Sequence, residues 1–206
     1  MQVKLGINSR IFVAGHRGLA GSAIVRELHR QGHRDVLVRT RDELDLLDMA
    51  AVMAFFECYR PTHVYVAAAK VGGIHANLTQ PADFIWQNLQ LANNLVYAGW
   101  KNQVGKMLFL GSSCIYPRQA PQPLREDYLL TAPLEPTNEW YAVAKVAGIK
   151  LCQAFRRQYE CNFISAMPCN MYGPNDNFDL EKSHVIPALI RKFHEAKLSG
   201  RDHVVC

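Results

Sequence analysis

The sequence predicts an α/β protein built on a doubly wound parallel sheet, and three observations lead to this fold class. Short runs that are apolar almost throughout alternate with longer amphipathic runs along the chain. Strands of that composition are typical of a parallel sheet covered by helices on both faces. A glycine-rich turn separates the first apolar run from the first amphipathic run. The alternation then implies parallel strands joined by right-handed crossovers.

Each element is predicted from its own stretch of sequence. The apolar runs are rich in Val, Ile and Phe, which favour strands. They predict strands over residues 10–14, 35–39, 63–68, 106–111 and 163–167. The longer runs repeat apolar residues at helical spacing. They predict helices over residues 19–31, 49–59, 82–101, 139–159 and 185–197.

Two stretches are irregular. Residues 117–136 hold five of the ten prolines, which excludes a helix or a central strand there. Residues 168–183 also have the composition of a loop. Because both follow predicted strands, both should overhang the carboxyl edge of the sheet, where ligands bind in such folds. Residues 203–206 (HVVC) begin what has the pattern of a further strand, so we expect the chain to be a fragment.

Composition narrows the classes of partner and location. The chain has 206 residues, 49% of them hydrophobic, and a net charge of +5 that is scattered rather than gathered into a basic run. This excludes an obvious nucleic-acid surface and suits anionic small molecules. No apolar run reaches the ~18 residues of a membrane span, and no signal peptide precedes the first strand, so we expect a cytoplasmic protein. The six cysteines lack metal-ligand spacing and are expected to be reduced, mostly as core residues, with no metal bound.

A glycine motif follows the first strand. Gly15, Gly18 and Gly21 give the pattern GxxGxxG at the point where the first helix begins. The first glycine permits a tight turn, the second lets the backbone approach a pyrophosphate, and the third allows close packing of helix on strand. The start of the helix adds N–H groups and a positive dipole end. The motif predicts a Rossmann-type dinucleotide-binding domain.

The end of the second strand indicates which dinucleotide binds. An NAD site needs an acidic residue there to hold the ribose 2′-hydroxyl. This strand instead runs into Arg39 and Arg41, with no acid before Asp42, and Arg17 lies inside the glycine loop. Guanidinium groups suit a 2′-phosphate. The three arginines therefore favour NADP(H), although surface arginines of no function are the alternative for each.

A second motif carries acid–base chemistry. Tyr141 and Lys145 are four residues apart in a predicted helix, so both side chains lie on one face. An ammonium beside a phenol is expected to lower the tyrosine pKa from its usual value near ~10. The fourth strand ends in Gly111, and Ser112 or Ser113 can there hydrogen-bond a substrate oxygen. Strand end and helix should meet in a doubly wound fold.

At this point the residues resemble the extended short-chain dehydrogenase/reductases, whose catalytic set is Ser or Thr, Tyr and Lys. Seven blocks narrow the resemblance to the GDP-L-fucose synthase family, from about residue 10 to the end of the chain. The blocks are residues 15–24 (GHRGLAGSAI), 39–48 (RTRDELDLLD), 67–74 (AAAKVGGI), 111–117 (GSSCIYP), 135–152 (EPTNEWYAVAKVAGIKLC), 170–178 (NMYGPNDNF) and 183–196 (SHVIPALIRKFHEA).

This resemblance implies an activity. The substrate would be GDP-4-keto-6-deoxy-D-mannose, epimerised at C3 and C5 and then reduced at C4 by NADPH to GDP-L-fucose. The family assigns the base and acid of epimerisation to Cys114 and His184. Tyr141, supported by Lys145 and Ser112, would steady the enolate oxygen and later protonate O4. A thiolate of lowered pKa and a histidine both titrate near neutrality, which fits these roles.

The resemblance also implies further contacts and an assembly. Cofactor contacts would include His16, Leu19, Ala69 and His184, beside the glycines, the arginines, Tyr141 and Lys145 named above. Asn170, Val185, Leu189 and Lys192 would contact the nucleotide sugar. Residues 1–182 would form the NADP-binding domain with the catalytic residues, and residues 183–206 the start of a truncated substrate domain. The helices over 82–101 and 139–159 would pair in a homodimeric four-helix bundle. Their apolar residues would either contribute to that bundle or simply cover the sheet; these are Ile85, Leu89, Val96, Ile149 and Phe155.

Two other readings remain open. A sister enzyme of the same fold, such as a GDP-mannose dehydratase or a UDP-sugar epimerase, would share most of these motifs. A dehydratase typically carries a glutamate near the catalytic Ser or Thr, where this chain has Cys114. A truncated, non-catalytic NADP-binding protein is the second alternative, against which the intact Ser112, Tyr141 and Lys145 argue.

Overall fold

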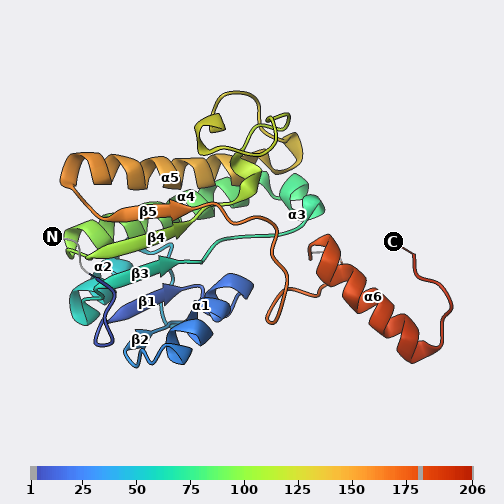
Figure 1. The fold of residues 1–206 in the computed structure, drawn as a ribbon, viewed down its shortest axis with the longest axis horizontal. Helices are drawn as coiled ribbons and strands as arrows, with labels where there is room; N and C mark the ends of the chain where they lie inside the picture. Colours follow the sequence, from blue (N-terminus) through green and yellow to red (C-terminus); the bar gives the residue numbers. More distant parts are fainter. Residues whose placement is uncertain (1–3, 181–182, 206) are drawn as a thin grey trace.

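A computed structural model describes residues 4–180 and 183–205 and confirms the predicted fold class (Figure 1). Five strands form one parallel sheet in the order β2-β1-β3-β4-β5. The strands are β1 (Ile11–Ala14), β2 (Val36–Leu37), β3 (His63–Val66), β4 (Lys106–Leu110) and β5 (Phe163–Ala166). The helices are α1 (Leu19–Arg30), α2 (Met49–Tyr59), α3 (Ile74–Thr79), α4 (Pro81–Lys101), α5 (Glu139–Tyr159) and α6 (Val185–Ser199).

The two faces of the sheet are covered unequally. From β1, Phe12 and Ala14 point into the larger core, which also contains buried residues of α2, α4 and α5. Ile11 and Val13 point to the other face and pack with Leu28 of α1 in a smaller cluster. Strand residues alternate between the faces, so each apolar run supplies both layers. The crossover direction reverses after β2, because β1 leads outward to β2 and the chain then returns past β1 to β3.

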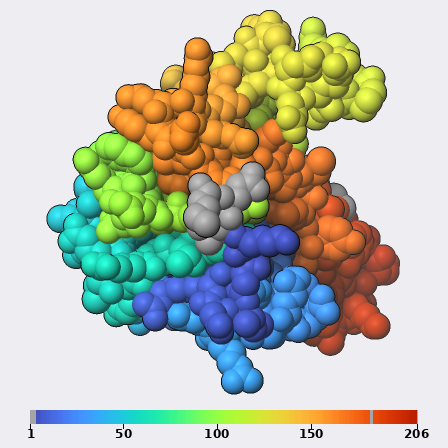
Figure 2. Space-filling model, turned by 60° about the vertical axis from the view of Figure 1, so that its left-hand side comes forward, coloured from blue at the N-terminus to red at the C-terminus, as the bar shows by residue number. Residues whose placement is uncertain are grey.

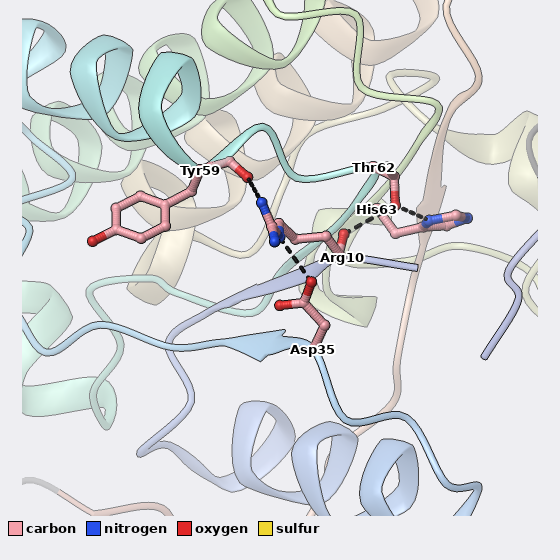
Figure 3. A network of polar contacts seen from close by, with 5 residues as sticks. All are labelled: Arg10, Asp35, Tyr59, Thr62 and His63. Atoms are coloured by element: carbon pink, nitrogen blue, oxygen red, sulfur yellow. Dashed lines mark hydrogen bonds and ion pairs between the residues drawn. The ribbon is translucent and has the colours of Figure 1, made fainter. Parts of the chain in front are cut away.

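The amino edge of the sheet is tied together by polar contacts around Arg10 (Figure 3). Its Nε donates to the Asp35 carboxylate at 2.8 Å, and its Nη1 donates to the Tyr59 carbonyl at 3.0 Å. The Arg10 carbonyl accepts from the Thr62 hydroxyl at 3.0 Å, and that hydroxyl lies 3.0 Å from Nδ1 of His63. One residue thus links β1 to the approaches of β2 and β3 and to the end of α2.

Several expectations need correction. The second strand was expected over 35–39 but spans only two residues, and α3 was not expected. Residues 203–205 form no strand, because no neighbouring strand pairs with them, and Cys206 lies outside the described residues. For Val96 and Ile149, which are buried in the core, the structure fits the alternative that they cover the sheet. Of the cysteines within the described residues, all free, only Cys152 is fully buried, whereas Cys58 and Cys169 are exposed.

Two parts extend from the layered body. The proline-rich segment contains the 3₁₀ turns η2 (Glu126–Tyr128) and η3 (Pro136–Asn138) and stands out as the yellow lobe of Figure 2. α6 lies beside the body, at the end of the long irregular segment that follows β5 (Figure 1). The expected domain boundary after residue 182 falls at residues outside the described ranges. No helix within those ranges is long and apolar enough to cross a membrane.

Candidate active site

The turn between β1 and α1 is shaped by two glycines. Gly15 has a φ of 83°, and a Cβ on it would lie 2.6 Å from the backbone nitrogen of Ala68. A Cβ on Gly21 would collide with the Gly15 carbonyl oxygen. Both positions therefore require glycine because of close approach within the chain, and Gly15 also because of its left-handed backbone. The first and third glycines of the motif have the structural roles expected of them.

Gly18 differs, because a Cβ there would meet only the Gly15 carbonyl oxygen, at an ordinary 3.6 Å. Gly18 is the N-cap of α1, and no side chain caps this helix. An exposed helix start without a cap presents N–H groups and a positive dipole end to an anion. His16 and Leu19 flank this position half-buried, and Arg17 is exposed. The glycine turn and the uncapped start of α1 fit the pyrophosphate of a dinucleotide, because both are open on the side from which a ligand would approach.

The segment after β2 separates the two arginines predicted there. The Arg39 guanidinium lies over the rings of Phe55 and Tyr59, 5.4 and 4.7 Å from their centroids, and donates to the Val38 carbonyl at 2.8 Å. Arg41 is exposed, with only a loose 3.9 Å contact to Asp45. Of the two, Arg41 is thus the freer to meet a phosphate.

Glu43 is a residue that the sequence reasoning missed. Its carboxylate accepts from both the backbone nitrogen and the hydroxyl of Thr40, at 2.7 and 2.9 Å. These hydrogen bonds lower the pKa of the Glu43 carboxyl, and the charges of Arg39 and Arg17 lower it further. The signal was present as the pattern Thr-x-x-Glu at residues 40–43, which is typical of a reciprocal capping arrangement. Glu43 fixes the turn that carries the two arginines.

The predicted catalytic residues of β4 and α5 meet at the carboxyl edge. β4 ends at Leu110, and the turn η1 (Ser113–Ile115) follows, with the Ser112 hydroxyl accepting from the Cys114 nitrogen at 3.4 Å. Lys145 is only 4% exposed and donates its Nζ to the Leu110 carbonyl at 2.8 Å. The same Nζ lies 5.6 Å from the centroid of the Tyr141 ring. Ser112, Cys114, Tyr141 and Lys145 thus lie in one place, where spacing predicts Ser112, Tyr141 and Lys145 and the resemblance adds Cys114.

Burial controls the ionisation of these groups. Burial raises the pKa of Tyr141 well above its usual value, and the nearby Cys114 raises it further. Burial lowers the pKa of Lys145 to about 8. The expectation of a lowered Tyr141 pKa is therefore wrong, because desolvation of the phenol raises it. Burial also raises the pKa of Cys114, while hydrogen bonding with Ser112 and the charge of Lys145 lower it.

A sequence model described as the NAD dependent epimerase/dehydratase family matches residues 11–205. The chain belongs to the NAD dependent epimerase/dehydratase family. Its relatives are similar to it over most of its length. GDP-L-fucose synthase 1 of Arabidopsis thaliana is 60% identical over 96% of the chain, and GDP-L-fucose synthase of Escherichia coli is 57% identical over 95%. These matches confirm the resemblance found in the sequence.

A solved structure supports the same family assignment. A GDP-D-glycero-L-gluco-heptose synthase of Campylobacter jejuni, determined in the presence of NADPH, is 42% identical over 95% of the chain, with a TM-score of 0.90. The chain covers 57% of that protein. It likewise spans about 60% of the length of the curated relatives that it matches.

Other residues implied by the resemblance lie apart in this member of the epimerase/dehydratase family. His184 is the exposed N-cap of α6, and no hydrogen bond or ion pair within the described residues joins its side chain to the four residues above. Asn170 and Val185 are exposed, and Leu189 is half-buried. Lys192 donates to the Val205 carbonyl at 3.0 Å. Ala69 is half-buried after β3. No cluster of His, Cys, Asp or Glu in residues 4–180 and 183–205 is arranged to hold a metal.

Proposed function

We propose that this chain is the NADPH-binding and catalytic part of a GDP-L-fucose synthase, which converts GDP-4-keto-6-deoxy-D-mannose to GDP-L-fucose. The observation that carries the proposal is the meeting of Cys114 with Ser112, Tyr141 and Lys145 after the end of β4. A reductase needs only the last three, whereas the thiol adds a group able to move protons on carbon. The names of the curated relatives support the substrate class.

The reduction step uses the buried pair. NADPH, when bound, supplies the hydride that reduces the C4 ketone. Tyr141 holds its proton at neutral pH, because its pKa is raised, and donates it to O4. Lys145, with a pKa of about 8, is mostly charged at pH 7 and favours negative charge developing on the phenol oxygen. Ser112 supplies a further hydrogen bond to the substrate oxygen.

Epimerisation requires a base and an acid on opposite faces of the sugar. The protons on C3 and C5 are acidic because both carbons flank the C4 ketone. Cys114 removes them as the thiolate, which the Lys145 charge stabilises against the effect of burial. His184 returns protons from the other face. Its side chain is exposed at the start of α6, so this role requires α6 to lie closer to the carboxyl edge when substrate is bound.

The remaining contacts are part of the same proposal. Arg17 and Arg41 hold the 2′-phosphate of NADPH, with Arg39 beside them, and Ala69 contacts the cofactor. Asn170, Val185, Leu189 and Lys192 contact the nucleotide sugar. The protein works in the cytoplasm as a homodimer through α4 and α5. A sister dehydratase or epimerase, or a non-catalytic NADP-binding protein, fits the chain less well, because Cys114 joins an intact Ser-Tyr-Lys set.

The test separates the two steps by mutation. Residues 1–206 replace the matching part of the Escherichia coli relative, and product and deuterium uptake from solvent are followed with GDP-4-keto-6-deoxy-D-mannose and NADPH. Cys114→Ser should abolish uptake at C3 and C5, because a serine hydroxyl is far too weak a base, while slow reduction continues to a non-fucose sugar. His184→Asn should impair epimerisation by roughly 10²–10⁴-fold.

Tyr141→Phe serves as the matched comparison. It should remove reduction but leave NADPH binding intact, because only the phenol proton and its hydrogen bond are lost. Normal deuterium uptake in Cys114→Ser would show that the thiol is not the base. Absence of GDP-L-fucose from the unmutated chimaera would refute the proposed reaction itself.

A further inference from the structure

The loop over residues 67–73 lies close to the glycine turn at one end and to Phe84 of α4 at the other. It leaves β3 at Ala67, whose nitrogen donates to the Ala14 carbonyl at the end of β1 at 3.0 Å. Ala68 lies so close to Gly15 that a Cβ on that glycine would be 2.6 Å from the Ala68 nitrogen. The start of the loop is therefore the surface against which the glycine turn is built.

The other end of the loop packs toward Tyr141. A Cβ on Gly72 would lie 3.2 Å from the ring of Phe84 on α4. The Phe84 ring contacts the Tyr141 ring edge-on, with centroids 6.5 Å apart. The Lys70 ammonium lies 5.3 Å from the Phe84 centroid and 3.6 Å from the Asp83 carboxylate. A shift of this loop would thus displace the glycine turn and, through Phe84, the Tyr141 ring.

One buried side chain holds this loop to α4. Asn88, 4% exposed, accepts from the Lys70 nitrogen at 3.0 Å and donates to the Lys70 carbonyl at 3.0 Å. Its second amide hydrogen goes to the Phe84 carbonyl, one helical turn back, at 2.8 Å. Both backbone groups of Lys70 are therefore satisfied by a single amide, whose geometry is fixed by the helix. A backbone segment held in this way cannot slide without leaving buried polar groups unpaired.

We propose that Asn88 is a positioning residue for dinucleotide binding, and that it acts by fixing residues 67–73 at the distance from the glycine turn that the cofactor needs. It touches neither cofactor nor substrate and acts through Lys70 and Phe84. The inference rests on the proposed function only for the identity of the ligand, since the contacts themselves are all within the chain.

Asn94 provides the matched control. It is a second asparagine on α4, fully buried, and its amide donates to the Leu46 carbonyl of another loop at 2.8 Å. Asn88→Asp and Asn94→Asp both replace a buried amide by a carboxyl that faces backbone carbonyls. Both variants should lose stability, so a purely structural role predicts parallel behaviour. A positioning role predicts that only Asn88→Asp changes cofactor binding beyond its effect on stability.

The experiment measures two quantities on the 206-residue chain: hydrogen exchange of residues 67–73, and affinity for NADP⁺ by titration calorimetry. Asn88→Asp should speed exchange of residues 67–73 and weaken NADP⁺ binding about tenfold at pH 8, while Asn94→Asp leaves both within about twofold of the parent. The loss of NADP⁺ affinity in Asn88→Asp relative to the parent should become smaller toward about pH 5.5, because a protonated carboxyl regains one hydrogen-bond donor. The charged and titratable groups around this position are Lys70 and Asp83 beside the loop, and Tyr141 and Lys145 behind Phe84, and they are common to all three proteins.

The outcomes are distinct. Unchanged exchange of residues 67–73 in Asn88→Asp overturns the proposal, whether or not NADP⁺ binds. An equal loss of affinity in Asn94→Asp, or a deficit that does not vary with pH, reduces Asn88 to a general stabilising residue and also overturns it. Failure of the parent to bind NADP⁺ refutes the proposed function, while the exchange measurement still decides whether Asn88 fixes the loop.

Discussion

Lys145 is nearly fully buried, and its ammonium therefore costs folding free energy that a neutral side chain would not. The cost is offset in part by the hydrogen bond to the Leu110 carbonyl at 2.8 Å. Burial is also what sets its pKa near 8 and keeps the Tyr141 phenol protonated. At the scale of single residues, the same desolvation that destabilises the fold prepares a proton donor and an adjacent cation.

This leads to a prediction about pH. Lys145→Met should stabilise the chain at pH 7 by about 2 kcal/mol, from roughly 3 kcal/mol for the pKa shift less about 1 kcal/mol for the lost hydrogen bond. Between about pH 8 and pH 10.5 the unfolded parent binds more protons at this residue than the folded parent, so the parent gains stability as the pH rises. The extra free energy of unfolding of Lys145→Met, measured by urea unfolding, should therefore decrease across that pH range. A constant difference from pH 7 to pH 10 would contradict it.

Cofactor choice is the second residue-scale prediction. Arg41 is exposed with only a loose partner, whereas Arg39 is stacked on two rings. Arg41→Ala should therefore weaken NADPH binding by about tenfold or more, the value of one charge-assisted phosphate contact, and leave NADH binding nearly unchanged. Titration of both cofactors checks this, with exposed Arg26→Ala on α1 as the control. Equal affinity of the parent for NADPH and NADH would remove the basis of the assignment.

At the scale of elements, sequence reasoning succeeds where one physical rule dominates. Helices α2, α4 and α5 follow from apolar periodicity, and α2 is capped by Asp48, whose carboxylate accepts from the nitrogens of Ala50 and Ala51. The helix α3 was missed, because its six residues are too few to show a helical repeat and its large apolar residues, Ile74 and Leu78, are exposed. β2 is shorter than its apolar run because it lies at the edge of the sheet and pairs only with β1.

In the candidate site, too, sequence reasoning found some residues and missed others. The sequence located Tyr141, Lys145 and Ser112 because spacing and strand order bring them together. It could not give the direction of the Tyr141 pKa shift, which depends on how deeply the phenol is buried. Spacing could not reveal Asn88, whose role depends on contacts to the backbone of another segment, whereas Glu43 could have been found from its Thr-x-x-Glu pattern.

The capping contact gives an element-scale prediction. Asp48→Ala should destabilise the chain by about 1 kcal/mol, because two N–H groups at the start of α2 lose their acceptor. Asn93→Ala, an exposed change on α4, is the control and should stay within about 0.5 kcal/mol of the parent. Denaturant unfolding measures both. A loss in Asp48→Ala no larger than in the control would show that water replaces the carboxylate without cost.

At the scale of the whole molecule, exposed apolar side chains gather on particular helices. On α4 and α5 they include Trp86 and Trp140, which are 56% and 44% exposed. On α6 they include Ile190 and Phe193. Large exposed apolar groups that lie together are typical of surfaces that contact another protein. Two separate helical surfaces are therefore candidates for contact with another protein chain.

The proposed homodimer through α4 and α5 distinguishes between these surfaces. We expect sedimentation velocity to show a dimer for the parent at micromolar concentration and a monomer for Trp86→Glu, because a carboxylate would have to be buried in the interface without a partner. Phe193→Glu, which places the same charge on α6, should leave the dimer intact. Both substitutions replace an aromatic side chain that is more than half exposed, so neither should disturb the core, and circular dichroism should match the parent. Dissociation by Phe193→Glu but not by Trp86→Glu would move the interface to α6, and a monomeric parent would exclude the dimer altogether.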